Sequence, residues 1–457
     1  MSLQFHCSTK VDGVQLRTSA TILKAWIAAA LLVSCASHPP PVKTPSDAKV
    51  APEVSTASTA ERVRAWRAWE PSGLRTFHVE LPDGLMTADV DAKEQPKVEC
   101  KNGEDEMRVC SLVIELGKDD EGTPRTLGCA AASASAPLPF GVLVSRALGK
   151  MRLDELPRVE VAWGKGSGGD GSLVARFDAD GSYETDDQSN TMYGSAKIAA
   201  RYAPGHTFFC GDTSTGQRKA TERLTTQLFE SVKIKGIPER VVQQAYVERR
   251  GQTAAGFRFG FVRKADEGGF FEVESQFRVE STDTTWEVRD YTTSVTRDAK
   301  GVVETVRRVG AVGGEYVSVL TAKPGEAGRL RVKLEAGGKS DALEITPRVA
   351  LSTELWESPS LLRVAGGRAP KHRYAYVTTR DGEPTLGYAN LTRVRPGMVQ
   401  EEIEIQGVKV KDQAKQQRNE LSLDERGFVT KQVSSDSVYE RIHLSGSLPN
   451  LLPSKKP

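Results

Sequence analysis

Alternating apolar and polar positions dominate the chain from about residue 74 to residue 444. A period of two is the pattern of a half-buried β-strand, because successive side chains point to opposite faces. The pattern is strongest where Phe257, Phe259 and Phe261 share one face of an expected strand. Phe271 and Phe277 share one face of the next. We therefore expect antiparallel strands whose aromatic side chains gather on one side of a sheet.

Two segments interrupt this alternation. After Trp286 and Val288 the apolar positions move by one residue to Tyr291, Thr293 and Val295, and this parity switch predicts a β-bulge. Residues 347–368 begin at a proline, contain Trp356 and end at two glycines, which predicts a short helical insertion. Turn sequences at 298–301 and 424–427 separate the strands that flank these interruptions.

Three helices are expected earlier in the chain, one of them over about 214–229. Ser58 and Glu61 fit a capping box that begins a short helix over 58–71, with Trp66 and Trp69 on one face. Such a helix would either lie on a membrane surface or dock both tryptophans onto the next domain, and its shortness favours docking. A second helix is predicted over 138–151, where prolines precede it and a glycine lies near its end.

The fold class predicted from these patterns is α+β, mostly β. We expect an α+β sandwich domain over 72–237, with two disulfides, followed by a curved antiparallel β domain over 245–444. Residues 445–457 are expected to be a flexible tail. A chain of 457 residues normally holds two or three domains, which agrees with this division.

The first 57 residues have a different composition from the rest. Lys24 precedes a short apolar run over 25–33, about half of the roughly 20 residues that span a bilayer as a helix. A basic flank, a short apolar core and small residues at its end are typical of a secretory signal peptide, here residues 1–35. Residues 36–57 are rich in Pro, Ser, Thr, Ala and Lys, and predict a flexible tether.

Leu32, Val33, Ser34 and Cys35 at the end of this leader resemble the lipobox of bacterial lipoproteins. The resemblance implies that Cys35 is acylated and becomes the mature N-terminus. Ala36 follows the cysteine, and by the family's sorting rule this implies the outer membrane, with the protein facing the periplasm or the cell surface. A lipid carried by Cys35 would join the chain to a membrane.

The order of features over residues 245–440 resembles the curved-sheet domains of periplasmic lipoprotein carriers. The comparison uses the strands from Tyr246 to Phe261, the two turn sequences and the insertion at Pro347. It implies a sheet wrapped around an apolar concavity, with the insertion as plug or lid.

Charge and cysteine content limit the chemistry that is expected. The formal net charge is +2, so nothing directs the chain toward nucleic acid. Beyond Cys7 and Cys35, four cysteines remain, and an even number in an exported chain indicates disulfides. Three pairings are possible. We favour Cys100 with Cys110, because a turn signal lies between them, which leaves Cys129 with Cys210. No cysteine pair has zinc-ligand spacing, and no metal or cofactor is expected.

An enzyme is the least favoured class. His206, Cys210 and Asp212 could belong to a thiol enzyme, but His206 and Cys210 would lie about 13 Å apart in one strand, so a disulfide at Cys210 is the better interpretation. The glycine-rich residues 164–171 lack the ending of a phosphate-binding loop.

The aromatic residues of the second domain allow two interpretations. They form either an ordinary core, which we favour, or the lining of a site for a lipid or acyl chain. The residues concerned are Phe257, Phe259, Phe261, Phe271, Phe277, Trp286 and Trp356. We expect a non-enzymatic, lipid-anchored envelope protein that binds an apolar ligand, a lipoprotein or a protein partner. The alternative is a scaffold of an envelope assembly without a ligand.

Overall fold

The structure is a computed structural model of the chain. It describes residues 66–69, 77–82, 99–102, 107–118, 124–148, 152–153, 158–164, 172–184, 191–212, 226, 228–234, 240–265, 268–281, 286–299, 303–345, 370–380, 383–405 and 418–446. The predicted leader, tether and helical insertion lie outside these residues, as do Cys35 and Trp356; of the predicted tail over 445–457, only residues 445 and 446 are described, and they end a strand.

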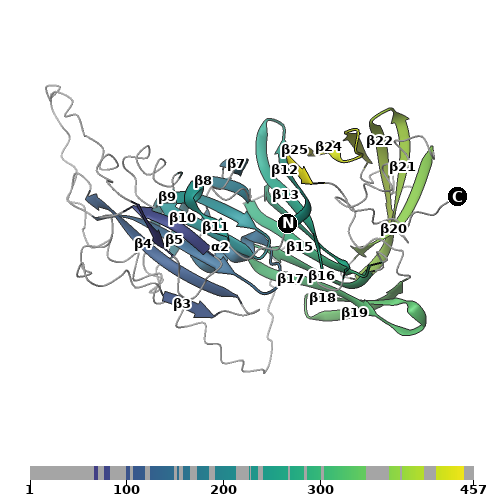
Figure 1. Cartoon of the computed structure of the whole chain (residues 1–457), viewed down its shortest axis with the longest axis horizontal. Coiled ribbons are helices and arrows are strands. Elements are labelled where there is room, and N and C mark those ends of the chain that lie inside the picture. The colour runs from purple at the N-terminus through teal and green to yellow at the C-terminus, as the bar shows by residue number, and fades with distance from the viewer. Residues whose placement is uncertain are drawn as a thin grey trace, which may run out of the picture.

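Two antiparallel sheets make up the first part of the chain, which we call the first body (Figure 1). The smaller sheet has the order β1-β2-β11, and comprises β1 (Trp66–Trp69), β2 (Phe77–Pro82) and β11 (Lys233–Ile234). The larger sheet has the order β3-β4-β5-β10-β9-β8-β6, with β7 also paired to β8. Its strands are β3 (Glu99–Asn102), β4 (Arg108–Lys118), β5 (Pro124–Ser133), β6 (Arg152–Leu153), β7 (Arg158–Gly164), β8 (Ser172–Glu184), β9 (Thr191–Ala203) and β10 (His206–Asp212).

The predicted helices have different outcomes, and of the one over about 214–229 only residues 226, 228 and 229 are described, all of them helical. Helix α2 (Phe140–Leu148) lies within the predicted range 138–151. The prediction of a helix over 58–71 is wrong for Trp66–Trp69, which form β1 and pair with β2 in antiparallel register. A helix this short is marginal on its own, whereas pairing with a neighbouring strand satisfies its backbone groups at once.

The second body is one antiparallel sheet of 14 strands, with the order β19-β18-β17-β16-β15-β14-β13-β12-β25-β24-β23-β22-β21-β20. The strands of its first half are β12 (Arg240–Arg250), β13 (Thr253–Lys264), β14 (Phe270–Ser281), β15 (Trp286–Arg297), β16 (Val303–Val312), β17 (Glu315–Pro324), β18 (Leu330–Ala336) and β19 (Lys339–Ile345), with the short 3-10 helix η3 (Glu326–Gly328) before β18. Those of its second half are β20 (Lys371–Arg380), β21 (Glu383–Arg395), β22 (Met398–Ile405), β23 (Arg418–Leu423), β24 (Val429–Val433) and β25 (Val438–Gly446).

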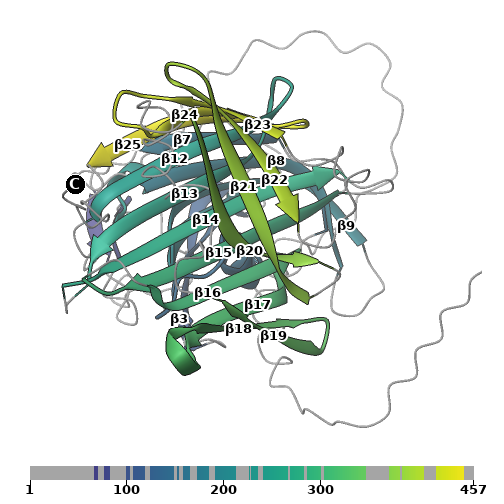
Figure 2. The same cartoon turned by 90° about the vertical axis from the view of Figure 1, so that its right-hand side faces the viewer.

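This strand order arises from two meanders joined in the middle. The chain runs outward from β12 to the edge strand β19, resumes at the opposite edge with β20, and returns to β25, which pairs with β12. The sheet curves so strongly that β18 and β19 lie close to β21, although the two edges do not pair (Figure 2). The prediction of a mostly β chain with a large curved antiparallel sheet is confirmed.

The curved sheet has two faces, and both are covered. The first body packs on the face that we call the outer face, whereas β20–β22 cross in front of the other, inner face (Figures 1 and 2). Phe257, Phe259 and Phe261 point to the outer face, and the alternate residues of β13, including Arg258, point to the inner face.

The parity switch in β15 has another cause than a bulge. The register between β14 and β15 is continuous from Trp286 to Arg297, so the predicted bulge against β14 is wrong. Thr292 on the outer face and Thr293 on the inner face are both about 1% exposed. Apolar residues occur at both parities because both faces of this strand are buried.

Hydrophobic packing joins the two bodies into one core. The largest cluster contains Phe140 and Tyr202 of the first body together with Phe257, Phe259 and Phe277 of the second. We call this contact the joint. On the inner face, smaller clusters form around Leu320 and Val332, around Leu391 and Val399, and around Val262 and Phe428.

Candidate functional site

The predicted ligand-binding phenylalanines lie in the joint. The ring of Phe140, at the start of α2, lies 5.3 Å from the Phe257 ring and 5.1 Å from the Phe277 ring, edge to face in both cases. Tyr202 lies 5.0 Å from Phe140 and 5.8 Å from Phe257. Phe257, Phe259 and Phe277 therefore form an ordinary core, which was the favoured interpretation, and not the lining of a ligand site, because side chains of the first body occupy the space that they face.

The remaining predicted aromatic residues are placed as follows. Arg240 lies 4.8 Å above the Phe261 ring, and Arg263 lies 4.5 Å above the Phe271 ring. Trp286 begins β15, and its side chain is outside the described part of the structure, as is all of Trp356. None of these positions brings the seven residues together around one open space within the described ranges.

A second contact at the edge of the joint was missed from the sequence. Trp163 of β7 stacks on His443 of β25, with ring centroids 3.9 Å apart and planes 5° apart. Trp163 also stacks on Phe259 at 5.8 Å. Burial, with Arg240 nearby, lowers the pKa of His443. The lone histidine and the alternating Trp163 gave no signal of this pairing, because their strands are far apart in the chain.

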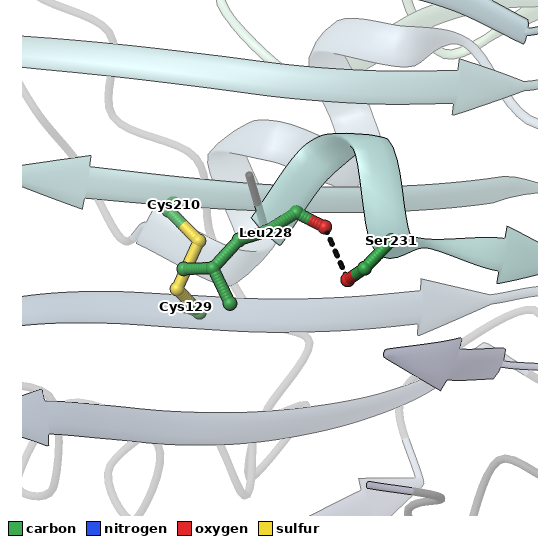
Figure 3. The surroundings of a disulfide bond; sticks show 4 residues. All are labelled: Cys129, Cys210, Leu228 and Ser231. Carbon is green, nitrogen blue, oxygen red and sulfur yellow. Dashed lines mark hydrogen bonds between the residues drawn. A yellow bond between two sulfur atoms is a disulfide. The ribbon is translucent and has the colours of Figure 1, made fainter. Parts of the chain in front are cut away.

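The disulfide prediction is confirmed for Cys129 and Cys210, which face each other on the paired strands β5 and β10 (Figure 3). Leu228, in the short helical segment that packs beside them, is fully buried. Cys110 is also disulfide-bonded, and the residue opposite it in the β3–β4 register is Cys100. This register agrees with the favoured pairing.

The disulfide removes the basis of the thiol-enzyme alternative. A sulfur held in a disulfide is not a thiolate nucleophile. His206 instead shares a hydrogen bond of 2.9 Å between its Nδ1 and the Ser133 hydroxyl, and its ring lies 6.1 Å from that of Phe77. Burial, with a smaller contribution from Arg240, lowers the pKa of His206 to about 4, so the ring is neutral at neutral pH. His206 is a partly buried structural histidine.

Polar and charged side chains occupy the middle of the inner face, and we call them the inner charge network. They come from strands that are neighbours in the sheet, β12 to β14, β24 and β25. The members are Glu248, Arg258, Glu274, Gln276, Arg278, Gln432 and Tyr439. Arg258, Glu248 and Glu274 are each no more than 3% exposed, so their charges are almost fully removed from water.

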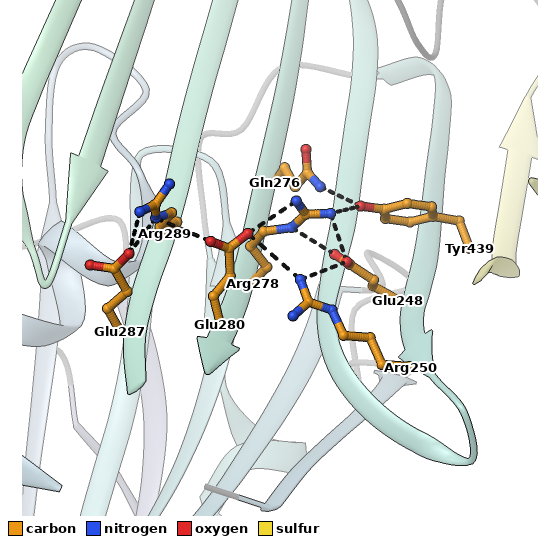
Figure 4. Close-up of polar contacts among 8 residues, drawn as sticks. All are labelled: Glu248, Arg250, Gln276, Arg278, Glu280, Glu287, Arg289 and Tyr439. Atoms are coloured by element: carbon orange, nitrogen blue, oxygen red, sulfur yellow. Dashed lines mark hydrogen bonds and ion pairs between the residues drawn. The ribbon is translucent and has the colours of Figure 1, made fainter. Parts of the chain in front are cut away.

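Arg278 is the centre of this network (Figure 4). Its guanidinium donates to Glu248 at 2.7 Å and to the Tyr439 hydroxyl at 2.8 Å, and that hydroxyl also accepts from Gln276. Burial acts to lower the pKa of Arg278, but Tyr439 and Glu248 outweigh this effect and leave the pKa above its ordinary value. Arg278 is therefore a permanent cation held by a buried carboxylate.

A glycine makes the Arg278–Glu248 contact possible. Arg278 lies on β14 and Glu248 on β12, so the arginine must cross β13, where the residue between them in the register is Gly256. A Cβ atom at Gly256 would lie 2.1 Å from the Phe277 carbonyl oxygen and 2.8 Å from the Arg278 Cα atom. Only glycine leaves the two neighbouring strands room to approach this closely.

Arg258 is the second cation of the network. Its guanidinium lies 4.2 Å above the Tyr439 ring, donates to Gln432 at 3.3 Å, and lies 3.9 Å from the Glu274 carboxylate. Tyr439 thus receives one arginine at its ring face and another at its hydroxyl. Two arginines and two glutamates balance in charge, which a buried polar cluster requires.

Toward the ends of these strands the network continues as a more exposed rim. Glu280 lies 3.2 Å from Arg278, 3.6 Å from Arg250 and 3.1 Å from Arg289. Arg289 also donates to Glu287 at 2.6 Å. The rim and the centre form the row of alternating charges in Figure 4. Arg289 is 54% exposed, in contrast to Glu248 at 0%.

These contacts can stabilise the folded sheet or bind a polar group. Arg278 keeps its proton, and its partner Glu248 is engaged by that cation. Within the described ranges, no group of three or more His, Cys, Asp and Glu side chains could hold a metal ion. These charged residues were not singled out from the sequence, because alternation along a strand does not show whether a polar face is buried.

No helix in the part of the chain that the structure describes is both long enough and apolar enough to cross a membrane. No family model matches the chain, and no curated protein matches it.

Two solved structures show some similarity. One is a β-barrel-like protein of the domain of unknown function DUF1849 from Brucella abortus, with 15% identity, 46% of this chain and 99% of that chain covered, and a TM-score of 0.35. The other is a DUF1089 family protein from Pseudomonas aeruginosa, with 15% identity, 38% and 87% covered, and a TM-score of 0.24. Similarity at this level carries no argument about function.

Proposed function

We propose that this chain is a lipid-anchored scaffold of the cell envelope, which binds a protein partner at the outer membrane and catalyses no reaction. The leader that ends at Cys35 supports the anchor. The Cys129–Cys210 disulfide supports export, because disulfides persist in oxidising compartments.

The observation that carries the scaffold proposal is the joint. The aromatic side chains that would line an apolar ligand site on the outer face pack against Phe140 and Tyr202 instead. An interface between domains that is this hydrophobic fixes their relative position. The two bodies therefore move as one rigid unit, which suits a protein that holds a partner in a fixed place.

The finer features of the fold belong to the same proposal. We take the first body as an α+β sandwich and the second as a half-barrel similar to those of periplasmic lipoprotein carriers. In the carriers the concave face is apolar, whereas here the inner face presents Arg258, Glu274 and Arg278 at its centre. This departure favours a scaffold over a carrier of lipid.

The anchor is tested with Cys35→Ser. We expect wild-type protein to enter the detergent phase of a two-phase extraction and the variant to remain in the aqueous phase, because the variant has no sulfur to acylate. Cys7→Ser is the matched control and should behave as wild type. Equal partition of Cys35→Ser and wild type into detergent would contradict the anchor.

The scaffold is tested by photo-cross-linking in cells. Val317 and Val394 are exposed apolar side chains, 47% and 56% accessible, and each can be replaced by a photoreactive residue. A partner that is bound at a fixed place gives one cross-linked species at one position and not at the other. Cross-linking at both positions to the same broad set of abundant proteins would contradict a specific partner.

A second candidate function is binding of an amphiphile at the inner face. The specific observation in its favour is that apolar clusters around Leu320 and around Leu391 lie on either side of the inner charge network. Native mass spectrometry of the Cys35→Ser protein distinguishes the two functions. A stoichiometric lipid in that protein would support amphiphile binding and contradict the scaffold, and its absence would do the reverse.

A further inference from the structure

A carboxyl group lies in the joint among its aromatic rings. Asp290 of β15 is on the outer face, is only 4% exposed, and accepts a hydrogen bond through Oδ2 from the backbone N–H of Gly141. Gly141 is the second residue of α2, so the carboxyl group of one body lies against the N-terminal end of a helix of the other. Backbone N–H groups at this end of a helix attract negative charge.

The packing gives the Asp290 carboxyl group fewer hydrogen bonds than its two oxygens can accept. A Cβ atom at Gly141 would lie 3.0 Å from Asp290 Oδ2 and 3.2 Å from Oδ1, so glycine is what allows the close approach. Oδ1 has no hydrogen-bond partner among the described residues. An ionised carboxylate can accept about four hydrogen bonds, and a single N–H compensates little of the cost of burying its charge.

The surroundings of Asp290 contain hydroxyl groups and apolar side chains. The Tyr202 hydroxyl lies 2.8 Å from Ser275 Oγ, which lies 2.8 Å from Thr292 Oγ1, and Tyr202 also donates to the Leu138 carbonyl at 3.2 Å. Tyr202, on β9, is a titratable side chain near Asp290: burial raises its pKa, and the charge of Asp290 adds to this effect. The residues opposite Asp290 in the register are Phe277 on β14 and Ala311 on β16, and the described α2 side chains at 140–144 are uncharged.

We propose that Asp290 is a pH-sensitive latch between the two bodies: the joint is firmest while this carboxyl group holds a proton, and it loosens when the group ionises. The latch is independent of the anchor and of any partner. It goes beyond the scaffold function, because it makes the rigidity of the scaffold depend on the acidity of the surroundings.

The direction of the effect follows from linkage. Burial raises the pKa of Asp290 from 3.8 to about 7, and the Gly141 N–H only partly opposes this. When the joint opens, the carboxyl group returns to water and its pKa falls toward its ordinary value. The closed joint is therefore fully favoured below about pH 4 and loses this advantage as pH rises to about 7. The ratio of open to closed molecules rises by up to about tenfold for each pH unit in this window.

The test compares wild type with Asp290→Asn between pH 5 and pH 8. Asparagine keeps the shape and can still accept the Gly141 N–H, but it does not titrate. The readout is hydrogen exchange of residues 140–148, corrected for the intrinsic dependence of exchange on pH. In wild type the opening that this reports should increase between about tenfold and hundredfold from pH 5 to pH 7. In Asp290→Asn this increase should be absent.

Two controls isolate Asp290. Thr292→Val removes a neighbouring hydroxyl without removing the carboxyl group, so it should keep the pH dependence of wild type. Burial lowers the pKa of His206 to about 4, and this histidine titrates with the opposite sign. His206 is present in both wild type and Asp290→Asn, so its contribution cancels when the pH dependence of one protein is subtracted from that of the other. Exchange in β18 and β19, away from the joint, should show no pH-dependent difference between the proteins.

Equal pH dependence in wild type and Asp290→Asn would overturn the proposal. Should Asp290→Asn not fold, Asp290→Ser replaces it, since serine is neutral and smaller. Should neither fold, wild type alone decides the question. Opening of residues 140–148 that does not increase with pH relative to β18 and β19 would equally overturn the latch.

Discussion

The two faces of the curved sheet are buried by different physical means. The outer face is covered with phenylalanine rings that pack against Phe140 and Tyr202, and its stability comes from apolar area removed from water. The inner face is buried to the same degree at Arg258 and Glu248, but there each charge needs an opposite charge or a hydrogen bond. Removal of one side chain should therefore have different consequences on the two faces.

The largest effect is expected on the outer face. Phe257→Ala removes a fully buried ring that contacts Phe140, Tyr202 and Phe277, and leaves a cavity between the two bodies. The free energy of unfolding should fall by about 3–5 kcal/mol in urea titrations. Val394→Ala is the control: this side chain is 56% exposed, and its removal should cost under about 0.5 kcal/mol. Similar losses for the two variants would mean that the joint is not a packed core.

An intermediate effect is expected at the inner face. Glu248→Ala leaves the Arg278 guanidinium without its buried carboxylate, and because Arg278 is 26% exposed the loss should be about 2–3 kcal/mol. The double variant Glu248→Leu/Arg278→Leu should recover much of this loss, since it leaves no unpaired charge. A double variant less stable than Glu248→Ala would show that the charges stabilise the face beyond compensating each other.

The smallest effect is expected at the rim of the same network. Arg289→Gln breaks contacts with Glu280 and Glu287, but this arginine is 54% exposed and its charge is already solvated. The change in the free energy of unfolding should stay below about 1 kcal/mol and should shrink further in high salt. If Arg289→Gln lowered the free energy of unfolding as much as Glu248→Ala, the centre and the rim of the network would contribute equally to stability.

The alternation of residues was sufficient to predict which residues share a face. Phe257, Phe259 and Phe261 lie together, Phe271 and Phe277 continue the stripe on the next strand, and the turn at 424–427 forms as expected, with Asp424 accepting from the backbone N–H of Phe428. These are local features, because a period of two and a turn sequence depend only on neighbouring residues. The Cys129–Cys210 pair was the one that remained once the turn signal between Cys100 and Cys110 favoured that first pairing.

The sequence did not predict which segments cover each face of the sheet, because only the tertiary structure determines this. The same phenylalanine stripe would serve a ligand or a neighbouring domain equally well, and α2 settles this by inserting Phe140 at the joint. Charged residues such as Arg258 and Glu274 gave no signal of burial in the sequence, yet both are buried on the inner face of the 14-stranded sheet. The sequence determines the side to which each residue points, because that depends on the backbone. Whether water, a partner strand or another body lies on that side depends on contacts between segments far apart in the chain.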